Sequence, residues 1–82
     1  MLIISVIERD CRIYNKDFQC RYIGAPCHSF DEARELVNAH CDWGNEISVT
    51  SYCQNDTSYA EISRETGEVI KEYFVRGIES EF

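Results

Sequence analysis

Two cysteine–histidine pairs are the residues in this sequence whose types could do chemistry. Cys27 and His28 precede a predicted helix, and His40 and Cys41 lie at its other end. Thiolate and imidazole groups bind zinc, or act as nucleophile and base when they lie within hydrogen-bond reach. Because a helix rises about 1.5 Å per residue, the two pairs are expected to lie about 18 Å apart. One metal cannot be ligated from both ends, so we predict no metal site.

The cysteines also give no signal for covalent catalysis. Cys27 stands near a helix N-terminus, where the pKa of a thiol can be lowered, but His28 is its direct neighbour and points away from it. We predict an exposed loop thiol at Cys27 and small apolar fillers of the core at Cys20, Cys41 and Cys53. The chain has no phosphate-binding glycine loop and no hydrolase or metalloprotease motif. We therefore predict no catalytic residues, no cofactor and no enzymatic activity.

One helix is predicted between the two pairs. Ser29 is followed three residues later by Glu32, which is the capping-box pattern. Apolar residues then recur at helical spacing, at Phe30, Ala33, Leu36 and Val37. The pattern predicts a helix over residues 30–42 that stops at Gly44. We expect Trp43 to pack under the sheet edge, and an exposed tryptophan at this position would be a binding anchor.

Strand patterns surround the helix and set the fold class. They cover residues 2–7, 18–23, 47–53, 59–63 and 68–75, with a turn at 15–17 and a polar loop at 54–58. Residues 64–67 end in a glycine, which is typical of a hairpin turn. The order ββαβββ predicts an α+β two-layer sandwich with one helix packed on an antiparallel sheet. We expect a single domain over residues 1–76 and a short frayed tail at 77–82.

One face of the predicted sheet has no helix to cover it. Large apolar side chains occupy both alternating sets of the last strand, including Tyr73 and Phe74. The uncovered face is therefore predicted to carry aromatic and aliphatic surface, which often marks a partner-binding or homodimer surface. The alternative is a set of scattered tyrosines whose hydroxyl groups stay in water.

Charge narrows the class of partner. The chain of 82 residues has a net charge of −7. Residues 1–41 hold six acidic and five basic residues, whereas residues 42–82 hold nine acidic and three basic ones. This sign disfavours direct contact with nucleic acid or an anionic membrane, and it favours a basic protein or one that normally binds nucleic acid. The alternative is that the charge serves solubility.

Compartment signals point to a reducing cytoplasm. The apolar run at residues 2–7 is far shorter than the roughly 20 residues of a membrane span and lacks the features of a signal peptide. Five cysteines form an odd, scattered set, which is typical of reduced thiols. We therefore expect a cytoplasmic protein in which the sequon at residues 55–57 has no role.

The predicted protein-binding surface is the acidic C-terminal hairpin with its tyrosines. Glu61 and Glu72 are expected to lie near each other across two strands, where like charges destabilise a sheet unless something positive binds. Exposed tyrosines would add contact area to this surface. The predicted binding residues are Glu61, Glu65, Glu68, Glu72, Tyr59 and Tyr73.

The order of these segments resembles a known class of small proteins. An apolar strand at residues 2–7 is followed by the helix start SFDEAR at 29–34 and the glycine-turn hairpin AEISRETGEVI at 60–70. This layout is similar to that of small phage-encoded proteins that block bacterial defence, including type I-F anti-CRISPR proteins. The resemblance implies a protein-binding inhibitor and assigns no individual residue. The alternatives are a structural homodimer and a small cysteine–histidine enzyme or metal protein.

Overall fold

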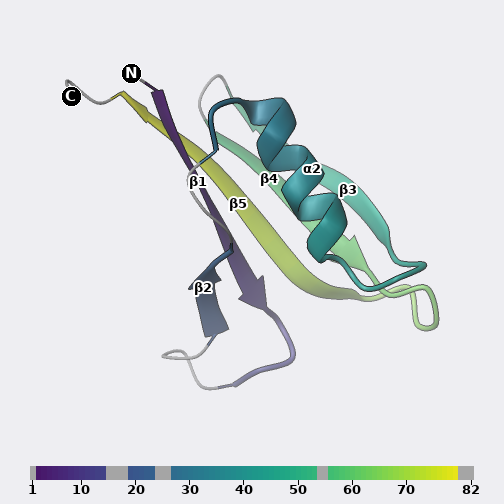
Figure 1. Ribbon diagram of the computed structural model, residues 1–82. Coiled ribbons are helices and arrows are strands. Elements are labelled where there is room, and N and C mark those ends of the chain that lie inside the picture. Colours follow the sequence, from purple (N-terminus) through teal and green to yellow (C-terminus); the bar gives the residue numbers. More distant parts are fainter. Residues whose placement is uncertain (1, 15–18, 24–26, 54–55, 80–82) are drawn as a thin grey trace.

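Five antiparallel strands form one sheet, and helix α2 (Phe30–His40) packs on one of its faces (Figure 1). The computed structural model describes residues 2–14, 19–23, 27–53 and 56–79. The strands are β1 (Leu2–Asp10), β2 (Cys20–Tyr22), β3 (Glu46–Cys53), β4 (Asp56–Ile62) and β5 (Val69–Glu79). Their order across the sheet is β2-β1-β5-β4-β3. The predicted α+β class and the order ββαβββ are confirmed.

Strand β1 lies inside the sheet, and apolar side chains on both faces are typical of such a strand. It pairs with β5 along its whole length and with β2 from Ile7 to Arg9. Ile4 and Val6 are buried in the core on the helix side, whereas Ile3 and Ile7 are half-buried on the other side. The alternation follows because successive side chains of a strand point to opposite faces of the sheet.

The capping box places the start of α2 as predicted. The Glu32 amide donates to Ser29 Oγ at 3.1 Å, and a Glu32 carboxylate oxygen accepts from the His28 amide at 3.0 Å. The helix ends at His40, two residues before the predicted end, because Cys41 takes an extended backbone conformation with a ψ of 150°. The Cys41 amide still donates to the Val37 carbonyl and completes the last turn. Gly44 lies outside the helix in the following turn.

The core lies between α2 and the strands β1 and β5, which the helix contacts. Its buried residues are Ile4, Val6, Ile23, Cys27, Ala33, Val37, Tyr59, Tyr73 and Val75. The prediction of an exposed Cys27 is wrong, since its amide donates to the Ile4 carbonyl at 3.0 Å and draws it into the core. The prediction that Cys20 and Cys53 fill the core is also wrong, because both are exposed. Cys41 is half-buried.

Two segments that were predicted as loop or tail belong to strands. Gly77, Ile78 and Glu79 pair with the first residues of β1, so β5 continues past the expected domain boundary at residue 76. Asp56 to Ser58 pair with both β3 and β5, although their polar sequence predicted a loop. In both cases the long neighbouring strand supplies hydrogen-bond partners that a local pattern cannot show. The predicted turn at 15–17, Phe18 and residues 80–82 lie outside the described residues.

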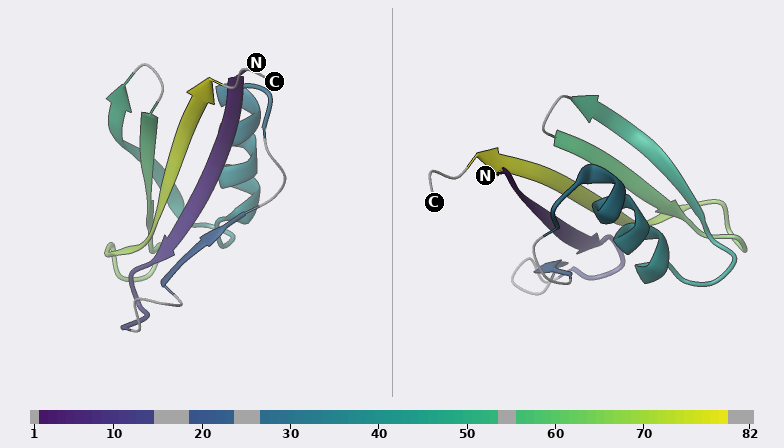
Figure 2. Two further views of the ribbon diagram at one scale, coloured as in Figure 1. Left: turned by 90° about the vertical axis from the view of Figure 1, so that its left-hand side faces the viewer. Right: turned by 45° about the horizontal axis from the view of Figure 1, so that its top comes forward.

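The sheet face away from α2 carries apolar side chains, as the sequence predicted. Figure 2 shows the helix confined to one side of the sheet. On the other side, Ile7 stands in register between Tyr22 on β2 and Phe74 on β5, and Ile3 stands opposite Ile78. Ser5 opposite Arg76 lies between these two apolar rows, and Arg9 opposite Glu72 follows the Ile7 row along β1. The uncovered face is therefore a mixture of apolar and charged rows.

Candidate functional site

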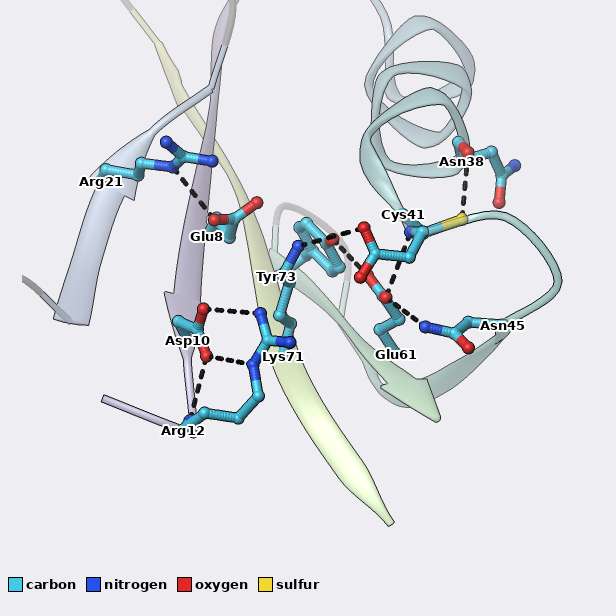
Figure 3. A network of polar contacts seen from close by, with 11 residues as sticks. Glu8, Asp10, Arg12, Arg21, Asn38, Cys41, Asn45, Glu61, Lys71 and Tyr73 are labelled. Atoms are coloured by element: carbon cyan, nitrogen blue, oxygen red, sulfur yellow. Dashed lines mark hydrogen bonds and ion pairs between the residues drawn. The ribbon is translucent and has the colours of Figure 1, made fainter. Parts of the chain in front are cut away.

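On the helix side of the sheet, beyond the end of α2, the inward-facing side chains are polar. Glu8, Glu61, Lys71 and Tyr73 are all buried there, and each occupies a position that faces the helix layer. The register places Glu8 opposite Tyr73 and Glu61 opposite Lys71. Figure 3 shows Glu61, Lys71 and Tyr73 close to the loop after α2, and Glu8 beside Arg21 of β2. We call this group the polar network.

Glu61 is the centre of the polar network. One carboxylate oxygen accepts from the Tyr73 hydroxyl at 2.6 Å, and the other accepts from Asn45 Nδ2 at 2.7 Å and from the Asp42 amide at 3.2 Å. Burial alone would raise the pKa of Glu61, but these hydrogen bonds and the nearby Lys71 ammonium hold that pKa below its usual value. Glu61 is therefore a buried carboxylate that stays charged at neutral pH.

The consequence of these bonds is a fixed loop around Trp43. Glu61 holds the residues on both sides of Trp43, and the Asn45 amide donates to the Asp42 carbonyl at 3.1 Å to close the turn. Gly44 takes a positive φ of 88° there, a conformation that suits glycine. The prediction that Trp43 packs under the sheet edge is wrong: the turn directs it outward, and it is 90% exposed.

The hairpin between β4 and β5 supports the same loop from the other side. The Arg64 amide donates to Asn45 Oδ1 at 2.9 Å. The Arg64 guanidinium lies 5.6 Å from the centre of the Trp43 ring, within the range of a cation–π contact. Trp43 is therefore exposed to solvent but held by neighbours from two different segments.

An open hollow of about 610 Å³ adjoins Trp43. Its lining residues are Arg12, Asp42, Trp43, Asn45, Ser63, Arg64, Glu65 and Ile70. The side chains bring both signs of charge and one aromatic ring to the same concave surface. Such a surface can take up a side chain of a binding partner.

A second hollow of about 250 Å³ shares Arg12 with the first. Arg12 donates to both carboxylate oxygens of Asp10, each at 2.9 Å. This contact, against the opposing effect of burial, lowers the pKa of Asp10 to about 2. Arg21 donates to Glu8 at 3.0 Å on the opposite wall. Each of these two carboxylates is therefore paired with an arginine.

Lys71 links the polar network to the loop after α2. Its ammonium is nearly buried and lies 4.0 Å from an Asp42 carboxylate oxygen. The other oxygen of Glu8 is buried without a hydrogen-bond partner among the described residues. A buried carboxylate oxygen without a hydrogen-bond partner costs stability.

Half of the predicted binding residues are buried. Glu65 and Glu68 are exposed at the turn of the hairpin, and Glu72 is half-buried on the face away from the helix. The prediction that Tyr59 and Tyr73 are exposed is wrong, because strand alternation turns both toward the core. Glu61 is buried for the same reason. It stands opposite Lys71 and not Glu72, so the predicted like-charge pair does not form.

The cysteine–histidine pairs lie at opposite ends of α2 (Figure 1). Burial raises the pKa of the Cys27 thiol, as it does that of Cys41, which is opposite to the lowered value that a nucleophile needs. In the part of the chain that the structure describes, no three histidine, cysteine or acidic side chains gather as metal ligands would.

The contact between the Trp43 ring and the Arg64 guanidinium was not predicted from the sequence. The turn-forming residues Asp42, Gly44 and Asn45 around Trp43 are the signal that could have placed this tryptophan on the surface.

Comparisons with protein-family models, curated proteins and solved structures gave no match. Among the described residues, no helix has the length and apolar character that crossing a bilayer requires.

Proposed function

We propose that this protein is a non-enzymatic interaction module that binds a basic protein surface through Trp43 and the acidic side chains around it. We call Asp42, Trp43, Arg64 and Glu65 the Trp43 site. The observation that carries the proposal is the 90% exposure of Trp43 on a loop that Glu61 and Arg64 hold in place. Covering this ring in an interface would remove its apolar surface from water, which favours binding.

The chemistry of the Trp43 site fits a protein partner. Tryptophan and arginine are the residues that most often dominate the binding energy of interfaces. The hydrogen bonds around Trp43 fix its loop before binding, so less conformational entropy is lost when a partner docks. The hollow beside Trp43 provides space for a side chain of that partner.

The acidic side chains near Trp43 and the net charge of the chain favour a positively charged partner. Asp42 is 61% exposed in its side chain, and Glu65 and Glu68 are exposed on the neighbouring hairpin. Together with the net charge of −7, they attract a basic surface and speed its encounter. A protein that normally binds nucleic acid is one such partner. The proposed role is that of an inhibitor from a phage or mobile element, acting in the cytoplasm.

The proposal is tested by retention on the immobilised protein. Bacterial lysate is passed over the wild type, Trp43→Ala and the matched control Tyr14→Ala, whose tyrosine is fully exposed elsewhere on the surface. Bound proteins are eluted in a salt gradient and identified by mass spectrometry. We expect a dominant basic protein that leaves at raised salt, is retained by Tyr14→Ala, and is lost from Trp43→Ala.

Two results would reject this function. Equal retention by all three proteins would show that Trp43 is not part of the interface. Retention that does not weaken with salt would remove the electrostatic part of the proposal, because interactions between exposed charges are screened as ionic strength rises.

A further inference from the structure

The two edges of the sheet differ in how they are protected. The edge strand β2 is only three residues long and carries Arg21 at its centre. The opposite edge strand β3 has eight residues, and its residues 47–53 include no charged side chain and no proline. Natural proteins commonly protect edges with short strands, charges or proline, whereas β3 is long, lacks proline and carries its one charged residue, Glu46, at its first position.

Strand β3 offers the chemistry that another strand recognises. It pairs with β4 on one side, and it is the last strand of the sheet on the other. Its outward amide and carbonyl groups therefore face no further strand among the described residues. Val49 is 57% exposed and Ile47 is half-buried, and both lie on the helix side of the sheet. An edge with unpaired backbone groups and exposed β-branched side chains fits one more strand.

We propose that the occupant of this edge is a second copy of the same chain, joined through antiparallel pairing of two β3 strands around a twofold axis. The proposal goes beyond the Trp43 site and does not depend on it. The pairing would extend the five-stranded sheet of each copy into one continuous sheet across the dimer. A twofold interface uses the same surface on both subunits, so a single edge supplies both halves.

The composition of β3 favours a second copy. A twofold axis at Ser48 would set Val49 of each copy opposite Ile47 of the other, which gives apolar cross-strand pairs on the helix side. The same axis would set each Glu46 opposite a Thr50, so the only charge of the strand would not meet its own copy. The β3–β4 ladder changes register between Val49 and Ser51, which confines the pairing to residues 46–50.

The net charge predicts an unusual salt dependence for this dimer. Two chains of net charge −7 repel each other, and salt screens that repulsion. The dimer is therefore expected to strengthen as ionic strength rises, whereas binding of a basic partner at the Trp43 site weakens. The two interactions are distinguishable by this opposite response.

The test is sedimentation equilibrium of the purified protein over a concentration series, at low and high salt. Val49→Asp places two carboxylates near the axis and is expected to raise the dimer dissociation constant at least about tenfold. The matched control is Val69→Asp, which changes a valine of similar exposure, 45%, on β5 and away from the edge strand. It is expected to change the dissociation constant less than about twofold.

A measurement on the unmodified chain keeps the test valid if Val49→Asp fails to fold. The amide resonances of residues 46–50 should shift with concentration and become protected from hydrogen exchange in the dimer. A wild type that stays monomeric at millimolar concentration overturns the proposal. So does a dimer whose concentration-dependent shifts lie at Ile3, Phe74 and Ile78, because that dimer would use the uncovered face.

Discussion

The helix side of the sheet has two halves that are built by the same strands and filled with opposite chemistry. Under α2, the inward positions hold Ile4, Val6 and Val75, which form an apolar core. Beyond the end of α2, the same alternation places Glu8 on β1 and Lys71 on β5. The first half stabilises the fold through apolar burial. In the second half, the buried Glu61 fixes the loop after α2 and thereby positions Trp43 on the surface.

The largest effect is expected in the apolar half. Replacing the fully buried Ile4 by alanine removes core contacts and leaves a cavity, which should lower the free energy of unfolding by about 2–5 kcal/mol. Ile78→Ala, on an exposed side chain of the other face, should change it by less than about 0.5 kcal/mol. Urea unfolding followed by circular dichroism measures both. Equal losses in the two variants would contradict the assignment of the core.

The polar half is expected to respond differently, through the Trp43 loop. Glu61→Ala leaves the Tyr73 hydroxyl and the Asn45 amide without their acceptor, which should cost about 1–3 kcal/mol of unfolding free energy. The anisotropy of Trp43 fluorescence should fall because its loop is released. Glu61→Gln keeps an acceptor oxygen, so the anisotropy of Trp43 fluorescence should fall less in this variant. If the anisotropy of Glu61→Ala equals that of the wild type, Glu61 does not hold the loop.

A pair of glycine substitutions sharpens the same comparison. Gly44→Ala puts a residue with a Cβ at a φ of 88°, and this Cβ would lie 3.1 Å from Cδ of Arg64. We expect a loss of about 1–2 kcal/mol from the left-handed backbone together with a change in the Trp43 emission. Gly67→Ala has a similar φ of 72° but no atom within 4 Å of its Cβ. It should lose stability without any change in emission, and an equal emission change in both would contradict the described contact.

The polar half should also make stability depend on pH. The pKa values of Glu61 and Asp10 are lowered in the folded protein, Asp10 to about 2, so both groups contribute stability above their unfolded values near 4. That stability is lost as pH falls from about 5 through the folded pKa values. Urea unfolding at pH 7, 4 and 3 should show a smaller loss for Glu61→Gln than for the wild type. An identical loss would show that Glu61 does not titrate in this way.

Local patterns predicted the elements but not which strand face is buried. The Ser29–Glu32 capping box placed the helix start because its hydrogen bonds join residues close in sequence. The last strand carries large side chains in both alternating sets, so composition could not decide whether Tyr73 or Phe74 turns inward. Long-range pairing decides it, because Glu61 and Tyr73 meet only after β4 and β5 take their register.

The same limit applies to the surface. The predicted packing of Trp43 under the sheet edge does not occur, and its exposure follows from three hydrogen bonds to Glu61 and Arg64 that cross between segments. No spacing in the sequence shows that a glutamate 18 positions after Trp43 controls the loop.

The central claim is that Trp43, held by Glu61, is the contact point for a basic partner. Trp43 is the only tryptophan, so its fluorescence can be followed when the protein is mixed with a retained partner whose own tryptophans are replaced by phenylalanine. The account predicts a shift of Trp43 emission to shorter wavelengths, saturating at one partner per chain and reversed by high salt. Binding that calorimetry detects while Trp43 emission stays unchanged would contradict it.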